Sequence, residues 1–224
     1  MAVKSIIELN NVHLKSDRGD KVFEDLSLHI KPGRSAVITG PAGSGKTILV
    51  ELLVGLRFAE SGSVELFDEC LLRGGKSLIR RTRRKIGGVG GVYGLVPSFT
   101  VAENVLFPLV LAGERRRIRR ERLLRMLTEF SLLKQAREYP PALTRVEYTL
   151  TQFARASIAN QPLLIIDEPL AGLDATTYGR ISEYLVKVSQ SGRSMLILAS
   201  DAPTRELPDT DYYRIDKGAL LCVG

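Results

Sequence analysis

The sequence has no tryptophan, two histidines and two cysteines in 224 residues. Cys70 and Cys222 are far apart and lack the paired spacing of a metal site, so we expect buried, reduced thiols and no disulfide framework. No stretch approaches the roughly eighteen consecutive apolar residues of a membrane-spanning helix. The first residues, MAVKSIIELN, lack the basic and apolar segments of a signal peptide. These absences predict a cytosolic protein.

Composition indicates how large a hydrophobic core the chain can form and which charge its binding partner carries. Hydrophobic residues make up 44% of the chain, which is enough for one domain with a substantial core. The formal net charge is +7 and the pI is about 9.5. This basic balance indicates an anionic partner, which could be a nucleotide, a nucleic acid or the inner face of a membrane. Composition does not choose among the three.

A glycine-rich segment matches the phosphate-loop pattern GxxxxGK[ST] at every fixed position. It follows the apolar run 36–38 and precedes the apolar residues 48–50, as expected for a buried strand that turns into a helix. We predict that Lys46 reaches the β- and γ-phosphates of ATP and that the Thr47 hydroxyl binds Mg²⁺. Gly43 and Gly45 would let the backbone approach the phosphate. The predicted nucleotide-binding residues are Gly40, Pro41, Ala42, Gly43, Ser44, Gly45, Lys46 and Thr47.

The remaining pattern predicts strands that alternate with helices. Alternating polarity within 5–30 indicates antiparallel strands, and continuous apolar runs at 35–39, 163–166 and 194–199 indicate buried parallel strands. Further strands are expected at 64–67 and 86–91, and a hairpin at 212–223. Helices are expected at about 45–56, 76–85, 101–111, 114–130, 144–160 and 176–190. The predicted fold is α/β, with a mostly parallel sheet covered on both faces.

Two acidic residues follow the buried strand at 163–166. Asp167 and Glu168 lie where the carboxyl end of that strand would meet the phosphate loop. We assign Asp167 to Mg²⁺, directly or through water, and Glu168 to the activation of water as a general base.

The helix predicted at 114–130 carries an unusual run of arginines. Leu123, Leu124, Leu127 and Phe130 are expected on one face, and the other face is almost all arginine. The run suggests contact with nucleic acid or acidic lipid. A solvated helix face is favoured, because no aromatic residues interleave with the arginines to stack on bases.

With these motifs in place, nearly the whole chain resembles the ATPase subunits of ABC transporters. Residues 40–47, LLIIDEP at 163–169 and the following Ala171, Gly172, Leu173 and Asp174 are similar to the family's Walker A, Walker B and D-loop in order and spacing. Within the family, the pieces LVPSFTVAENVLFPLVLAG and ARASIANQPLLIIDEP are most similar to cell-division, lipoprotein-release and lipid-trafficking ATPases.

The resemblance implies a P-loop NTPase domain of two lobes. A RecA-like core with an N-terminal antiparallel β part would span 1–87 and 161–224, and an inserted α-helical subdomain would span 88–160. It also implies a head-to-tail dimer, in which ATP lies between the Walker motifs of one subunit and the LSGGQ signature of the other. An integral membrane permease would dock beside the helical lobe, which places the chain at the inner face of the membrane.

Three positions depart from the family's pattern. The signature falls on 143–147, where Arg145 and Val146 replace two glycines, and the glutamine that contacts Mg²⁺ falls on Gly91. Ser200 stands where a switch histidine is expected, and serine cannot act as a cation. The aromatic residue that stacks on adenine, expected near residue 16, is missing, with His13 as a candidate substitute.

These features favour an ATP-binding and ATP-hydrolysing subunit of a membrane transport or membrane-remodelling complex. A homodimer would lack a normal signature at both sites and hydrolyse slowly, whereas a heterodimer with another ABC ATPase could hydrolyse normally. The alternative is a nucleotide-gated structural or regulatory protein with negligible turnover. A third hypothesis, an ATPase acting on DNA or the ribosome, has only the arginine run in its favour, and nucleic acid is not expected as a partner.

Overall fold

The computed structural model describes residues 3–16, 18–71, 75–168, 173–203 and 206–223. The strands are β1 Ile7–Lys15, β2 Lys21–Ile30, β3 Ser35–Thr39, β4 Ser61–Leu66, β5 Glu69–Cys70, β6 Ile86–Gly90, β7 Leu163–Asp167, β8 Ser194–Ala199, β9 Thr210–Asp216 and β10 Ala219–Cys222. The helices are α1 Lys46–Leu53, α2 Gly75–Arg83, α3 Val101–Leu111, α4 Arg116–Glu129, α5 Arg145–Ser157 and α6 Ala175–Gln190, with a 3₁₀ turn at Pro140–Ala142. The predicted alternation of strands and helices is confirmed.

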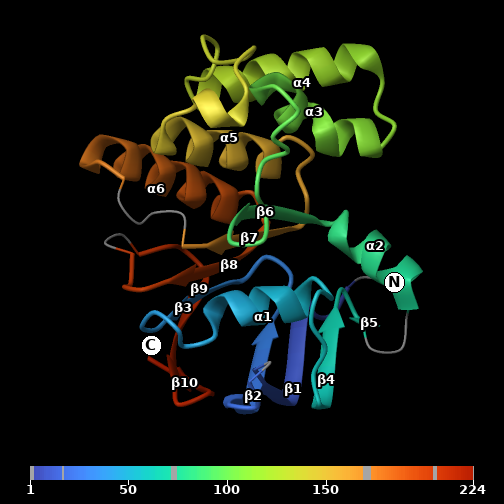
Figure 1. Ribbon diagram of the computed structural model, residues 1–224, viewed down its shortest axis with the longest axis vertical. Coiled ribbons are helices and arrows are strands. Elements are labelled where there is room, and N and C mark those ends of the chain that lie inside the picture. Colours follow the sequence, from blue (N-terminus) through green and yellow to red (C-terminus); the bar gives the residue numbers. More distant parts are fainter. Residues whose placement is uncertain (1–2, 17, 72–74, 169–172, 204–205, 224) are drawn as a thin grey trace.

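The strands form two sheets (Figure 1). The antiparallel sheet has the order β2-β1-β4-β5, and the larger sheet has the order β10-β9-β3-β8-β7-β6. In the larger sheet β9, β3, β8, β7 and β6 are parallel, and only β10 is antiparallel to its neighbour. The carboxyl ends of β3, β7 and β8 therefore lie at the same edge, where ligands bind in open α/β sheets.

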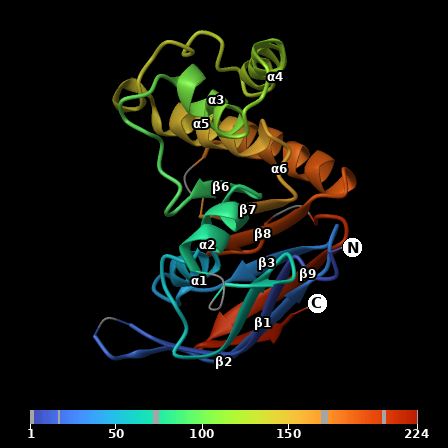
Figure 2. The same ribbon diagram turned by 90° about the vertical axis from the view of Figure 1, so that its right-hand side faces the viewer.

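The larger sheet separates two hydrophobic cores. Ala36 and Ile38 of β3 belong to the core shared with α1 and the antiparallel sheet, whereas Val37 belongs to the core shared with α3, α5 and α6. The continuous apolar runs in the sequence arise from this burial on both faces. Figures 1 and 2 show α1 between the two sheets and α3, α4 and α5 together in a separate helical lobe.

The second core provides a test of the packing between lobes. Phe153 of α5 is fully buried, and its ring stacks on that of Phe130 with centroids 6.2 Å apart. We expect Phe153→Ala to lower the free energy of unfolding by about 3–5 kcal/mol, because it removes a ring and leaves a cavity. Phe58→Ala, at a side chain 54% exposed, should change it by no more than about 0.5 kcal/mol. Urea denaturation measures both, and equal effects would contradict this assignment of the core.

Some details differ from the sequence-based expectation. Residues 86–90 pair in β6, as the strand expected at 86–91 predicts, so the boundary given at 88 for the helical subdomain falls inside the sheet. Leu124 is 59% exposed and does not join Leu127 and Phe130 in the core. Cys222 is exposed and Cys70 is half-buried, so neither thiol is fully buried. Among the described helices, none combines the length and apolar character needed to cross a bilayer.

Candidate functional site

The predicted phosphate loop lies between β3 and α1, at the carboxyl edge of the larger sheet (Figure 1). The Gly40 amide donates to the Ala199 carbonyl of β8, which fixes the start of the loop beside the neighbouring strand. Gly45 caps α1 with a left-handed backbone, φ +100°, so the helix begins at Lys46. The first amides of α1 are thus directed toward the loop, an arrangement that suits an anion.

Lys46 is a buried cation held by the loop itself. Its side chain is only 5% exposed, and Nζ donates to the carbonyls of Gly40 and Pro41 at 2.6 and 3.0 Å. Nζ also lies 3.1 Å from Oε1 of Glu168. A buried charge needs such partners, and the three oxygens occupy the ammonium group that was predicted to bind phosphate.

Glu168 follows β7 in an uncommon backbone conformation. Its φ is +53°, and its amide donates to the Leu198 carbonyl of β8 at 2.9 Å. The Ser200 hydroxyl donates to the same Oε1 that contacts Lys46, at 2.9 Å. The structure therefore brings Lys46, Glu168 and Ser200 together, and the contact between Ser200 and Glu168 was not predicted from the sequence.

Asp167 is buried beside the loop with its carboxylate oxygens unpaired. Neither Oδ1 nor Oδ2 has a hydrogen-bond partner among the described residues. Burial raises the pKa of the Asp167 carboxyl, and the nearby Thr47 hydroxyl opposes that shift. Gly91 leaves room for this carboxylate, because a Cβ at position 91 would lie 2.1 Å from Oδ2. The structure thus brings Thr47 and Asp167 together.

Tyr93 is a residue of the site that sequence reasoning missed. Its ring packs over Gly88, where a Cβ would lie within 2.2 Å of three ring atoms. Its hydroxyl is buried without a partner in the described part of the chain, and burial, with a further contribution from the charge of Asp167, raises the pKa of the phenol. The Tyr93 carbonyl accepts from Gln152 Nε2 at 2.9 Å and from Arg155. Tyr93 therefore joins α5 to the region of Asp167. The glycines of the strand at 86–90 could have indicated that a large side chain packs against this strand.

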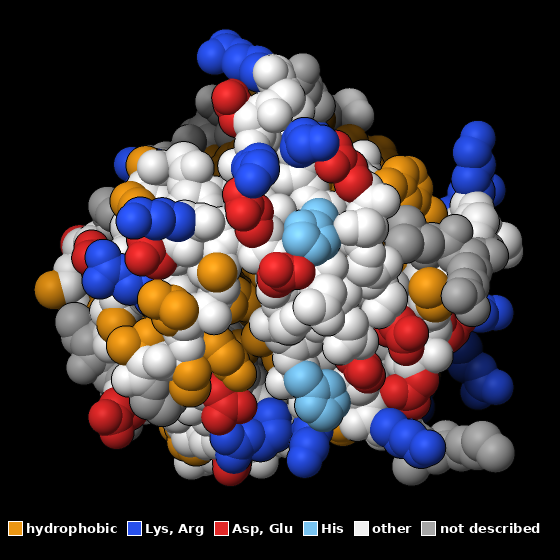
Figure 3. Space-filling model, turned by 90° about the horizontal axis from the view of Figure 1, so that it is seen from below, with side chains coloured by type: hydrophobic (Ala, Val, Ile, Leu, Met, Phe, Trp, Pro, Cys, Tyr) orange, Lys and Arg blue, Asp and Glu red, His pale blue; other side chains and the backbone are white. Residues whose placement is uncertain are grey.

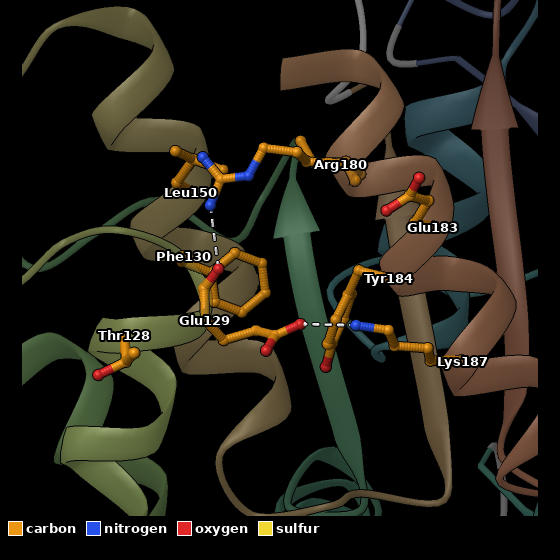
Figure 4. A pocket seen from close by; sticks show the side chains of 9 residues that line it. Thr128, Glu129, Phe130, Leu150, Arg180, Glu183, Tyr184 and Lys187 are labelled. Atoms are coloured by element: carbon orange, nitrogen blue, oxygen red, sulfur yellow. Dashed lines mark hydrogen bonds and ion pairs between the residues drawn. The ribbon is translucent and has the colours of Figure 1, made fainter. Parts of the chain in front are cut away.

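A separate cavity of about 260 Å³ lies between the end of α4, α5 and α6 (Figure 4). Lys187 Nζ lies 3.2 Å from Glu129 Oε1, and Arg180 donates to the Glu129 carbonyl at 3.1 Å. Tyr184 packs edge-on against Phe130. Glu129 thus contacts both Lys187 and Arg180, and these contacts stabilise the junction between α6 and the helical lobe. None of the phosphate-loop residues lines it.

The family described as "ABC transporter" matches residues 23–171, a span that contains the phosphate loop, Asp167 and Glu168. The chain belongs to the ABC transporter family. Similar proteins include the cell division ATP-binding protein FtsE of Streptococcus pneumoniae D39, which is 31% identical over 86% of this chain and 84% of that protein. The L-cystine transport system ATP-binding protein TcyN of Escherichia coli K12 is 29% identical over 97% of this chain and 89% of that protein. The lipoprotein-releasing system ATP-binding protein LolD of Chromohalobacter salexigens is 27% identical over 95% and 90%.

Solved structures agree with the family assignment. The chain is similar to the dimeric ABC transporter cassette MJ0796, with a TM-score of 0.86, 26% identity and 96% of each chain covered. A post-hydrolysis state of that cassette, bound to ADP and Pi, gives a TM-score of 0.84. The ABC subunit is therefore a nucleotide-binding ATPase with a P-loop NTPase fold, as predicted. It is a subunit of the kind that forms dimers in transport complexes.

The ABC subunit retains an ordered helix start where the family's signature is expected. Thr144 caps α5, its hydroxyl accepting from the Glu147 amide at 3.2 Å while Glu147 Oε2 accepts from the Thr144 amide at 2.8 Å. Arg145 is exposed on the first turn and Val146 is half-buried. Figure 1 shows α5 in the helical lobe and α1 in the core.

Two other groups of family positions are the candidate adenine-stacking residue and the predicted Walker B and D-loop residues after Glu168. His13 Nε2 lies 2.8 Å from Asp25 Oδ1, so this side chain is engaged in a contact between β1 and β2. Pro169, Ala171 and Gly172 of the predicted Walker B and D-loop lie outside the described residues. Asp174 caps α6 by accepting from the Thr177 amide at 2.9 Å.

Proposed function

We propose that residues 40–47 bind ATP and that the subunit hydrolyses it to drive a membrane permease through nucleotide-dependent dimerisation. The observation that carries the proposal is the buried Lys46 ammonium, held by two loop carbonyls and Glu168 at the carboxyl edge of the sheet. In this proposal Gly40 to Thr47 cradle the phosphates, and Lys46 contacts the β- and γ-phosphate oxygens.

The residues around Asp167 fit a magnesium ion. Mg²⁺ favours oxygen ligands and is held in nucleotide sites by one or two protein oxygens together with the phosphates. Two buried carboxylate oxygens without hydrogen-bond partners among the described residues, next to the Thr47 hydroxyl, meet that need. We assign Thr47 and Asp167 to the ion. Bound Mg²⁺ would supply charge neutralisation for the phosphate oxygens.

Glu168 is proposed as the general base, and its contacts suggest how ATP releases it. Oε1 of Glu168 faces Lys46 and accepts from Ser200. Phosphate oxygens compete with this carboxylate for the Lys46 ammonium, because both are anions. When Lys46 turns to the phosphates, Glu168 keeps the Ser200 hydrogen bond, which holds the carboxylate in place to accept a proton from water.

The contacts of Ser200 are also compatible with the alternative function, a nucleotide-gated regulatory subunit. A hydroxyl that is committed to Glu168 offers no cation to the γ-phosphate, and Gly91 offers no side chain to the metal. A nucleotide-gated regulatory subunit with negligible turnover would tolerate both features. Retention of Glu168 favours hydrolysis.

The membrane partner is proposed from the outer face of α3. This helix is apolar on nearly all sides, and such helices are normally covered. Val101, Val105 and Leu109 are buried, whereas Val110 and Leu111 are 48% and 50% exposed. We propose that a permease covers this face, which would place the subunit peripherally at the inner face of the membrane.

Co-purification tests the partner. We expect the tagged chain, isolated from detergent-solubilised membranes of its host, to retain an integral membrane protein, and Val110→Ser combined with Leu111→Ser to reduce that recovery about tenfold or more. Leu221→Ser, at an equally exposed side chain on β10, serves as the matched control. Absence of any integral membrane protein from the wild-type preparation would contradict the permease. A second ABC ATPase in the preparation would identify a heterodimer, and its absence from an active complex a homodimer.

A further inference from the structure

The strongest unexplained feature outside the nucleotide site is the charge of α4. Residues 114–125 contain seven arginines and two glutamates, a net +5 of the chain's formal +7. Residues 76–85 also carry a net +6, but there Arg81 and Lys85 pair with Glu69, and Arg83 donates to the Val54 carbonyl. Figure 3, which shows the opposite end of the molecule, has basic and acidic side chains interspersed.

Most of these arginines are not neutralised within the fold. Arg125 pairs with Glu121 at 3.4 Å, and Arg122 donates to the Ile158 carbonyl at 3.5 Å. The remaining exposed arginine side chains make no ion pair or hydrogen bond with any residue that the structure describes; they are Arg115, Arg116, Arg117 and Arg120. A solvated face stabilised by alternating charges would show the opposite pattern.

The arginines at the start of α4 also destabilise the helix. The first turn of α4 contains no acidic residue, and its N-cap, Arg115, makes no side-chain cap. Positive charge at a helix N-terminus opposes the helix dipole, and Arg116 and Arg120 repel each other at i,i+4. A bound anionic surface would remove both penalties.

The same face of α4 carries an apolar side chain. Arg117, Arg120 and Leu124 are spaced i, i+3 and i+7, so they lie on one side of the helix, and Leu124 is 59% exposed. Residues 108–129 include no aromatic residue, so stacking on bases is absent from this surface. Basic side chains beside an exposed leucine are the combination found in helices that lie on anionic membranes.

We propose that the exposed face of α4, formed by Arg116, Arg117, Arg120 and Leu124, binds the anionic headgroups of a phospholipid membrane. Figures 1 and 2 place α4 at the outer end of the helical lobe, away from the antiparallel sheet and α1, so contact here leaves the phosphate loop accessible. The inference concerns α4 alone and does not depend on hydrolysis or on a permease. The membrane supplies phosphate groups to the arginines and an apolar layer to Leu124.

Vesicle co-sedimentation of the purified chain tests the inference. We expect binding to vesicles of phosphatidylcholine mixed with an equal amount of phosphatidylglycerol, weak binding to phosphatidylcholine alone, and release at high salt. The triple variant Arg116→Gln, Arg117→Gln and Arg120→Gln should bind the mixed vesicles on the order of a hundredfold more weakly. The control variant Lys76→Gln, Arg80→Gln and Arg84→Gln removes the same charge from exposed side chains of α2 and the residue that follows it, and it should bind nearly as the wild type does.

Two further measurements separate a membrane from other anions. Leu124→Ser should weaken vesicle binding while leaving affinity for a single-stranded oligonucleotide unchanged, and inorganic phosphate at matched ionic strength should not displace the vesicles. Equal vesicle binding by the wild type and the α4 triple variant would overturn the proposal. So would tighter binding of the oligonucleotide than of the vesicles at equal phosphate concentration. Thermal unfolding and ATP affinity of each variant confirm that the fold and the nucleotide site are intact.

Discussion

Lys46→Ala is expected to abolish measurable ATP binding at concentrations that saturate the wild type. The side chain is the buried cation of the phosphate loop, and its three oxygen partners are positioned around one ammonium group. Truncating one member of a buried, hydrogen-bonded charge pair costs about 2–5 kcal/mol, which corresponds to a loss of roughly 30- to 5,000-fold in affinity. Equilibrium titration with a fluorescent ATP analogue measures the loss.

The variant also leaves Glu168 without its lysine, so stability must be measured with it. Thermal unfolding shows whether the chain still folds, and Lys46→Met, which keeps most of the side-chain volume, provides a second version of the test. Lys187→Ala removes a lysine that pairs with Glu129 at 3.2 Å on α6, and it should bind ATP as the wild type does. Unchanged ATP affinity in a folded Lys46→Ala protein would overturn the assignment of the phosphate loop.

Glu168→Gln should retain ATP and lose turnover. General-base catalysis contributes about 10²- to 10⁴-fold to rate, so the rate of phosphate release should fall by a factor in that range. Affinity for ATP should be equal to or higher than that of the wild type, because the neutral amide competes less well than a carboxylate for Lys46. Steady-state phosphate release and nucleotide titration on the same preparation separate the two effects.

This comparison also decides between the two functions. Equal, negligible turnover by wild type and Glu168→Gln, with ATP binding preserved in both, would favour the nucleotide-gated regulatory subunit. Glu183→Gln, at an exposed carboxylate of α6, is the control for a general effect of charge and should leave turnover unchanged.

The sequence predicted most of the fold because its periodic patterns coincide with burial. The apolar runs at β3, β7 and β8 are continuous because each strand contributes to two cores, and the phosphate loop has a pattern that few other structures produce. Leu124 was misplaced because the leucines of α4 do not all fall on the narrow stripe that contacts the core. The short strand β5 was missed because two residues are too few to show a period.

The contacts within the site were harder to predict, because they join residues far apart in the chain. No local pattern relates Ser200 to Glu168, because the two residues lie 32 positions apart in the chain. Tyr93 was overlooked because a single tyrosine in a loop belongs to no motif or periodic pattern that a sequence could reveal. Its burial depends on Gly88 and on donors from α5.

The glycine at position 91 cannot simply be replaced by the glutamine that the family's pattern places there. Its φ is +46°, and any Cβ there would lie 2.1 Å from the Asp167 carboxylate. A single change to glutamine would therefore push the side chain into the residue it was meant to assist. Because the Tyr93 ring occupies the space over Gly88, a glutamine at 91 would require the loop after β6 to be rebuilt together with its tyrosine. We expect substitutions at 88, 91 and 93 to be strongly epistatic, so that the effect of changing one of these residues depends on which residues occupy the other two.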